Sequence, residues 1–181
     1  MDFYEKPLSE LTSEEWEKIC LKCGKCCMCK YSGDGFIHFS NHICHYFDLS
    51  KGLCSCYEER LEVAKGDCKK VSLELLENDL GLLPPSCAYR SLYEGRGLPV
   101  FHPLLTKDPK SVEKAGQTLK ALPVFSEKAK DDALMDLLKQ VSQKRLSRDE
   151  VIQKAKEIHD KFALRWLESY PYPNETEKPT E

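Results

Sequence analysis

The sequence of 181 residues has no long hydrophobic run, no excess of basic charge and no apolar N-terminal stretch. None of its apolar segments approaches the ~18 residues that a membrane-spanning helix requires. Residues 1–18 are acidic, which does not fit a secretory or mitochondrial leader. The formal net charge is −3, and neither half of the chain is a basic platform for nucleic acid. We therefore expect a cytoplasmic protein that binds neither membranes nor nucleic acid.

Motifs of common enzyme classes are missing as well. The chain contains no Gly-rich phosphate loop, no G-x-G-x-x-G, no Ser-His-Asp constellation and no pair of catalytic carboxylates. Its hydrophobic share of 41% and charged share of 31% are ordinary for a globular protein. The length suits one domain, or one domain with an appendage. The sequence therefore names no reaction, and it leaves open whether the protein is an enzyme.

Cysteine is unevenly distributed: all ten lie at or before residue 87, and the rest of the chain has none. A disulfide scaffold requires export, so in a reducing compartment metal ligation explains clustered thiols better. Redox-active thiols are a further alternative. The candidate metal ligands are Cys20, Cys23, Cys26, Cys27, Cys44, Cys54, Cys56, Cys68 and Cys87.

The spacing of the first four of these cysteines is informative. Cys20 and Cys23 stand about one helical turn apart, which lets one metal take both sulfurs, with bonds near 2.3 Å for zinc. Cys23 and Cys26 repeat that spacing, and Gly24 between them allows a tight backbone turn. Neighbouring side chains diverge, so either Cys26 and Cys27 serve two separate sites or only one of them is a ligand. The later cysteines supply enough sulfur for two four-cysteine sites.

The identity of the metal stays open. Cys20, Cys23 and Cys26 match the first three positions of the bacterial ferredoxin run, but Cys29 follows at the wrong spacing and Lys30 replaces the proline. A remote cysteine can still complete an iron–sulfur cluster, and zinc suits a closed structural site equally well. We therefore expect zinc, iron or an iron–sulfur cluster as the cofactor.

Basic side chains accompany the cysteines, and a histidine lies further along the chain. Lys22, Lys25 and Lys30 place positive charge beside the thiolates, which lowers their pKa. His102, followed by Pro103, is expected to make hydrogen bonds at a turn.

The cysteine-bearing part of the chain predicts only short elements. We expect a knuckle and turn over residues 23–35, a strand at 36–39 and a turn at 50–52 between two short strands. Short helices are expected at residues 13–22, 72–80 and 87–94.

Helical periodicity marks the C-terminal part. Two helices, at about 127–144 and 148–169, are separated by a short loop and predict an antiparallel hairpin. Their apolar stripes are expected to pack against each other and against the cysteine-bearing part. The stripes comprise Leu134, Leu137, Leu138 and Val141 in the first helix, and Val151, Ala155, Ile158, Phe162 and Trp166 in the second.

These elements predict a small, irregular α+β fold stapled by metal, followed by a helical hairpin. We divide the chain into a cysteine-cluster domain at 1–105, a helical region at 106–169 and a disordered tail at 170–181.

Several motifs together carry a resemblance to a known family. The run C-x-x-C-x-x-C-C at 20–27 resembles the bacterial cysteine-cluster proteins described as zinc- or iron-chelating, in particular their YcgN-like branch. Further similar motifs are L-T-S-E-E-W-E at 11–17, C-S-C-Y-E-E-R at 54–60, D-C at 67–68, C-A-Y-R at 87–90 and H-P-L-L at 102–105. The resemblance implies a bacterial cytoplasmic protein with a cysteine-ligated metal and no settled biochemical role. Cys29 departs from the pattern, which makes it the weakest candidate ligand.

Three functions follow as hypotheses. The first is a protein that binds a metal through cysteines, either as a structural ion or as cargo. The second is an iron–sulfur protein in electron transfer or an oxidoreductase. The third is an interaction module whose C-terminal helices recruit a protein partner.

Overall fold

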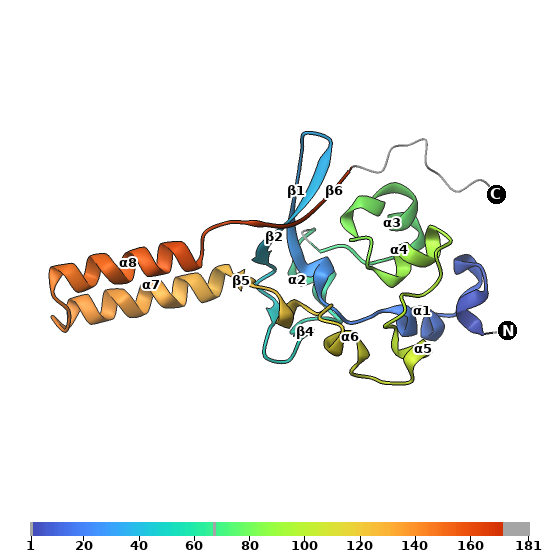
Figure 1. Ribbon diagram of the computed structural model, residues 1–181, viewed down its shortest axis with the longest axis horizontal. Coiled ribbons are helices and arrows are strands. Elements are labelled where there is room, and N and C mark those ends of the chain that lie inside the picture. Colours follow the sequence, from blue (N-terminus) through green and yellow to red (C-terminus); the bar gives the residue numbers. More distant parts are fainter. Residues whose placement is uncertain (1, 67, 172–181) are drawn as a thin grey trace.

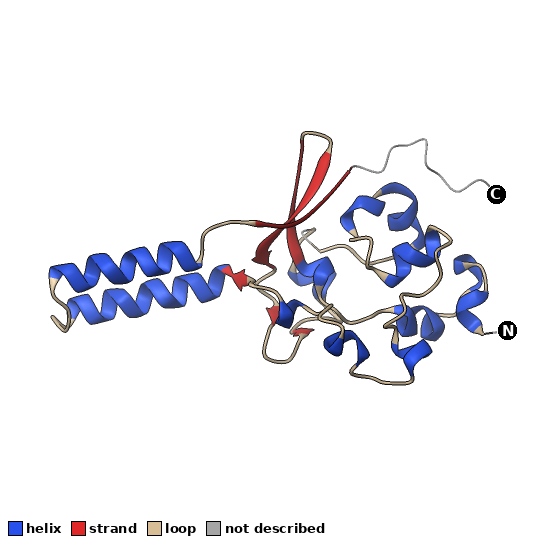
Figure 2. Ribbon diagram, in the orientation of Figure 1, coloured by secondary structure: helices blue, strands red, loops and turns tan. Residues whose placement is uncertain are grey.

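The computed structural model describes residues 2–66 and 68–171, which form an α+β body and a helical arm that projects from it (Figure 1). The arm consists of the two long helices, whereas the body contains only short ones (Figure 2). Within the described ranges, no helix combines the length and apolar character needed to cross a membrane. The helices are α1 (Ser13–Ile19), α2 (Arg60–Val63), α3 (Leu73–Asn78), α4 (Ala88–Tyr93), α5 (Pro103–Thr106), α6 (Ser111–Lys114), α7 (Glu127–Ser142) and α8 (Arg148–Lys161).

A small mixed sheet forms the centre of the body. Strand β2 (Phe36–Ile43) pairs antiparallel with β1 (Met28–Gly33) and β6 (Trp166–Pro171), and parallel with the short β5 (Phe125–Ser126). A separate two-stranded ladder joins β3 (Phe47–Asp48) to β4 (Leu53–Cys54) across the expected turn. The C-terminal region thus contributes two strands to a sheet that the cysteine-bearing part begins.

The buried side chains form two clusters. The first lies among α1, α3, α4 and α6 and comprises Ile19, Leu21, Leu75, Leu76, Leu83, Ala88, Tyr89 and Val112. The second lies on the sheet and comprises Met28, Ile37, Phe39, Ile43, Phe47 and Leu119. The segment between α1 and β1 carries Leu21 into the first cluster and Met28 into the second. We call residues 20–27 of this segment the cysteine loop.

Helices α1 and α4 are fixed to one another by a pair of aromatic side chains. A capping box between Thr12 and Glu15 starts α1 as expected. The ring of Trp16 lies 4.9 Å from that of Tyr89, and the Tyr89 hydroxyl donates to the Trp16 carbonyl at 2.9 Å. Since Cys20 directly follows α1 and Cys87 directly precedes α4, this pairing also brings the two cysteines to neighbouring positions.

The helical hairpin forms, but its second helix is shorter than expected. Ser147 and Glu150 make a capping box that starts α8, which ends at Lys161 rather than near 169. The Asn41 side chain donates to the Ala163 carbonyl and accepts from the Arg165 N–H, both at 2.9 Å, and this directs the chain back onto β2. Residues 170 and 171 end β6, so the tail prediction is wrong there; residues 172–181 lie outside the described part.

The expected packing of the apolar stripes is only partly correct. Leu137 is buried between α7 and α8, whereas Leu134, Leu138 and Val141 are 39%, 60% and 40% exposed. Because the arm projects from the body, α7 has one helix to pack against instead of two surfaces (Figure 1). In the cysteine-bearing part, residues 28–33 form β1 where a knuckle and turn are predicted.

Candidate metal centre

The nine candidate ligands come from five separate stretches of the body. Four of them, Cys20, Cys23, Cys26 and Cys27, belong to the cysteine loop. Cys20 and Cys87 cap α1 and α4, Cys44 follows β2, and Cys54 is in β4. Cys56 and Cys68 lie on the segments flanking α2. The electrostatic effects of these thiols on one another divide them into two sets.

The first set is Cys20, Cys23, Cys26 and Cys87. Burial raises the pKa of Cys23 to about 12 and of Cys87 to about 11, and it also raises the pKa of Cys20. The negative charge of Cys26 raises all three of these values further, so the four thiols lie within electrostatic range of one another. Without a cation, burial and mutual repulsion keep Cys20, Cys23 and Cys87 protonated.

Backbone N–H groups point at the sulfurs of this set. The N–H of Lys22 donates to Cys20 Sγ at 3.4 Å. The N–H of Lys25 does the same for Cys23, and those of Arg90 and Tyr89 for Cys87, which opposes the effect of burial on the pKa of both cysteines. Donors aimed at sulfur stabilise thiolates, the form in which cysteine binds metals.

The second set is Cys27, Cys44, Cys54, Cys56 and Cys68. The Sγ atoms of Cys54 and Cys56 are 3.8 Å apart. A tetrahedral metal with bonds of about 2.3 Å places two thiolates about 3.8 Å apart. The Cys44 N–H donates to the Cys27 carbonyl at 2.8 Å, which ties the cysteine loop to the end of β2. Burial raises the pKa of Cys68, and the charges of Cys26 in the first set and of Cys44 and Cys54 add to that effect.

Cys26 and Cys27 lie at the junction of the two sets. A hydrogen bond from Cys27 lowers the pKa of Cys26 to about 6, helped by the Lys30 ammonium, and the same bond raises the pKa of Cys27. The two side chains are therefore in contact instead of diverging. Cys26 still influences the first set, and Cys27 is influenced by Cys44 and Cys54 of the second. Whether both of these cysteines are ligands, or only one of them, stays a prediction.

The thiols of each set act on one another electrostatically, but in the described residues they do not form a closed coordination shell. Among residues 2–66 and 68–171, no three Cys, His, Asp or Glu side chains form a group that could hold a metal ion. Stapling of the fold by a metal is therefore not shown. Metal binding requires the side chains of a set to rotate toward a common point, a movement that the exposed Cys26 can make most freely.

The three lysines near the cysteines have different roles. Lys30 donates to the carbonyls of Cys26 and Met28 at 2.8 and 2.9 Å, and its charge acts on Cys26 as expected. The charge of Lys22 likewise lowers the pKa of Cys20, against the larger opposite effect of burial. The side chain of Lys25, in contrast, is only 6% exposed, and its ammonium binds distant polar side chains. Nothing in the sequence signals this burial, since Lys25 stands between a glycine and two cysteines with no helix or strand periodicity.

His102 confirms the expectation of a hydrogen-bonding role at a turn. Its Nδ1 accepts from the Leu104 N–H at 3.0 Å, so Nε2 carries the proton and donates to the Ile19 carbonyl, also at 3.0 Å. Burial lowers the pKa of His102, which favours this neutral form. Because Ile19 precedes Cys20, the bond fixes the point at which the cysteine loop leaves α1.

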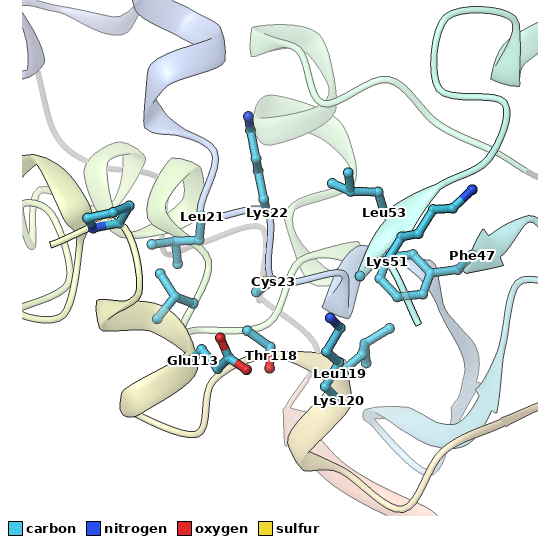
Figure 3. A pocket seen from close by; sticks show the side chains of 13 residues that line it. Leu21, Lys22, Cys23, Phe47, Lys51, Leu53, Glu113, Thr118, Leu119 and Lys120 are labelled. Atoms are coloured by element: carbon cyan, nitrogen blue, oxygen red, sulfur yellow. The ribbon is translucent and has the colours of Figure 1, made fainter. Parts of the chain in front are cut away.

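A cavity of about 270 Å³ opens beside the first set, between the cysteine loop, β3 and α6 (Figure 3). Cys23, Phe47 and Leu119 line it. The ammonium of Lys120 points toward the cavity, whereas Lys22 and Lys51 extend away from it (Figure 3).

The fold and the two sets define the class: a small α+β protein with a cysteine-rich centre. The chain belongs to the UPF0260 family. A UPF0260 protein of Shewanella denitrificans is 42% identical over 118 residues, which cover 64% of this chain and 80% of that protein. One from Haemophilus influenzae is 42% identical over 119 residues, 64% of this chain and 78% of the relative. One from Caulobacter vibrioides is 40% identical over 128 residues, 70% of this chain and 78% of the relative. No family model and no solved structure matches this chain.

Proposed function

We propose that this protein binds a metal, zinc or iron, through the two cysteine sets. The observation that supports the proposal is the convergence of nine cysteines from five stretches of the chain on one region of the body. Thiolate is the preferred ligand of zinc and of iron–sulfur clusters. None of these nine described cysteines forms a disulfide, as a reducing, cytoplasmic setting requires of metal-binding thiols.

The donor set fits such a metal chemically. The first set offers four sulfurs with backbone N–H donors aimed at three of them. The second set offers four sulfurs and one to spare, with Cys54 and Cys56 already at the separation that a shared metal atom requires. The proposal also assigns the protein to the cysteine-cluster family of zinc- or iron-chelating proteins, in its YcgN-like branch.

Purification under reducing, anaerobic conditions followed by total metal analysis tests the proposal. We expect at least one zinc or iron per chain. Visible absorption together with equal iron and acid-labile sulfide would identify an iron–sulfur cluster, and with it a role in electron transfer; a colourless zinc protein would exclude that role. A folded, monodisperse protein that contains no metal and takes up none would contradict the proposal.

A second function, recruitment of a protein partner, is supported by the arm. Five large apolar side chains of α7 and α8 are at least 39% exposed: Leu134, Met135, Leu138, Val141 and Ile152. Apolar side chains grouped on a projecting element are typical of interaction sites. The Leu138→Glu variant tests this function, because it should abolish binding of one reproducibly recovered partner while leaving metal content unchanged. Loss of binding together with loss of metal would instead indicate misfolding.

A further inference from the structure

Among the described residues, Lys25 is the least exposed lysine or arginine, and its side chain ends in an ammonium group. Its three N–H donors have three acceptors: Glu168 Oε1 at 2.9 Å, Gln117 Oε1 at 3.1 Å and Ser86 Oγ at 3.4 Å. These acceptors lie 61 to 143 positions further along the chain. A single side chain of the cysteine loop therefore fixes three remote segments.

Two contacts of Lys25, one through its backbone and one through its ammonium, involve the first cysteine set. The backbone N–H of Lys25 donates to Cys23, so a fixed Lys25 holds that donor in place. Ser86, which binds the Lys25 ammonium, directly precedes Cys87, whose charge reaches Cys23. Lys25 thus contacts Cys23 through its backbone N–H and the residue before Cys87 through its side chain.

The ion pair of Lys25 with Glu168 involves the far end of the described chain. Glu168 belongs to β6, which pairs with β2 opposite Phe39, and its second oxygen accepts from the Tyr170 hydroxyl. Only 20% of the Glu168 side chain and 6% of the Lys25 side chain are exposed. A buried ammonium that loses its carboxylate is strongly destabilised where it lies. The position of the cysteine loop therefore depends on β6, which follows the arm.

We infer that Lys25 is a positioning residue for the first cysteine set, and that the Lys25–Glu168 ion pair holds the cysteine loop in place only when β6 is docked on the sheet. This inference rests on the proposed function for its role in metal binding. The restraint on the loop itself can be measured without a metal.

The test compares Glu168→Gln with wild type in the full chain, using Co²⁺ alone as the probe of thiolate ligation. Glu168→Gln keeps the shape of the side chain and removes its charge. We expect a loss of Co²⁺ affinity on the order of 10-fold, with weaker sulfur-to-cobalt bands, as for changes next to metal ligands. Amide hydrogen exchange in residues 23–27 should become faster in the metal-free protein. Tyr170→Phe is the matched control, because it removes the neighbouring hydrogen bond on the same strand and leaves the ion pair.

The double variant Lys25→Met/Glu168→Met separates positioning from stability. A buried ion pair can be replaced by apolar side chains without loss of stability, so the thermal midpoint should return to the wild-type value. Co²⁺ affinity and loop protection should not return, because the bonds to Gln117 and Ser86 are gone. Full recovery of Co²⁺ affinity and loop protection in the double variant would overturn the inference. Wild-type Co²⁺ affinity and wild-type loop exchange in Glu168→Gln would overturn it as well. If the wild type bound no metal but the loop of Glu168→Gln exchanged faster than that of the wild type, the inference would be supported and the proposed function contradicted.

Discussion

The cysteine loop and the helical arm are held in shape by different kinds of contact. The loop depends on side chains that are remote in sequence, such as Glu168 on Lys25, 143 positions away, and His102 on Ile19, 83 positions away. The arm depends on caps within three residues, such as Ser147 with Glu150, and on a small interface around Leu137. The shape of the loop is therefore a property of the whole body, whereas the shape of the arm is encoded locally.

The largest expected effect is on the loop. Cys23→Ser should lower metal affinity at least about 10-fold, since even changes outside the ligand shell cost that much. The charges of all three other members of the first set, Cys26, Cys87 and Cys20, act on Cys23. Metal per chain after dialysis against a competing chelator measures the effect. Cys29→Ser, in β1, is the control and should leave metal content unchanged. Equal losses in both variants would make Cys29 a ligand.

Two deletions test whether the arm and the strand that follows it are separable. The rings of Phe125 and Phe162, at the base of the arm, are 5.2 Å apart, so a flexible linker of about four residues can replace residues 127–161. That variant should keep the metal and the urea unfolding midpoint of the body. Truncation after residue 165 removes β6 and leaves Lys25 buried without its carboxylate, at a cost of about 3 kcal/mol or more in the free energy of unfolding.

If the truncated chain were as stable and as metal-rich as the arm-less chain, β6 would not support the site. The chain could then be divided at residue 105, as the sequence alone predicts. A metal-free arm-less protein would show instead that the arm itself takes part in the site.

Single truncations to alanine sharpen the contrast within the two regions. Leu76 is 1% exposed in the body, and Leu138 is 60% exposed on the arm. Leu76→Ala should lower the free energy of unfolding by about 2–5 kcal/mol because it leaves a cavity. Leu138→Ala should change it by less than about 0.5 kcal/mol. Chemical denaturation followed by far-ultraviolet circular dichroism gives both values. A large loss for Leu138→Ala would show that the arm is packed in solution against a surface of its own or of another chain.

The last expected effect depends on pH. His102→Asn keeps the capping acceptor for Leu104 but loses the donor to Ile19, which costs about 1–3 kcal/mol at pH 7.5. Because burial lowers the pKa of His102, the unfolded chain takes up a proton below about pH 6.5 while the folded chain does not. The wild type should therefore lose stability from about pH 6.5 downward, until the pH reaches the folded-state pKa.

Wild type and His102→Asn differ only in the titration of His102. The difference between their free energies of unfolding should therefore shrink as the pH falls through that window. Denaturation curves at several pH values check this. A constant difference would mean that His102 is not buried in its neutral form.

Much of the fold could be predicted from the sequence because it is governed by local rules. The capping boxes at Thr12 and Ser147 start their helices where expected, and the turn at 50–52 joins two short strands. The end of α8 could not be predicted in this way. Trp166 continues the apolar spacing of that helix, yet Asn41, 125 positions earlier, binds the chain at residues 163 and 165 and redirects it into β6.

The sequence identifies the candidate cysteines but not which of them come together in space. Cysteine spacing marked the nine thiols and the special position of Cys26 and Cys27, because ligand spacing is a local property. It could not assign Cys87 to the first set or Cys44 to the second, since those neighbours are created by packing α4 on α1 and by the end of β2. Nor could it show that Lys25 faces Glu168 instead of simply compensating the thiolates.

The sequence by itself determined the composition of the cysteine centre, the class of fold and the helical arm, since each depends on residues within a few positions of one another. Only the tertiary structure decided which cysteines are neighbours, that strand β6 closes the sheet and that a buried lysine ties this strand to the cysteine loop. The physical reason is that burial and ion pairing depend on distance in space, and the residues involved here are 61 to 143 positions apart in the chain.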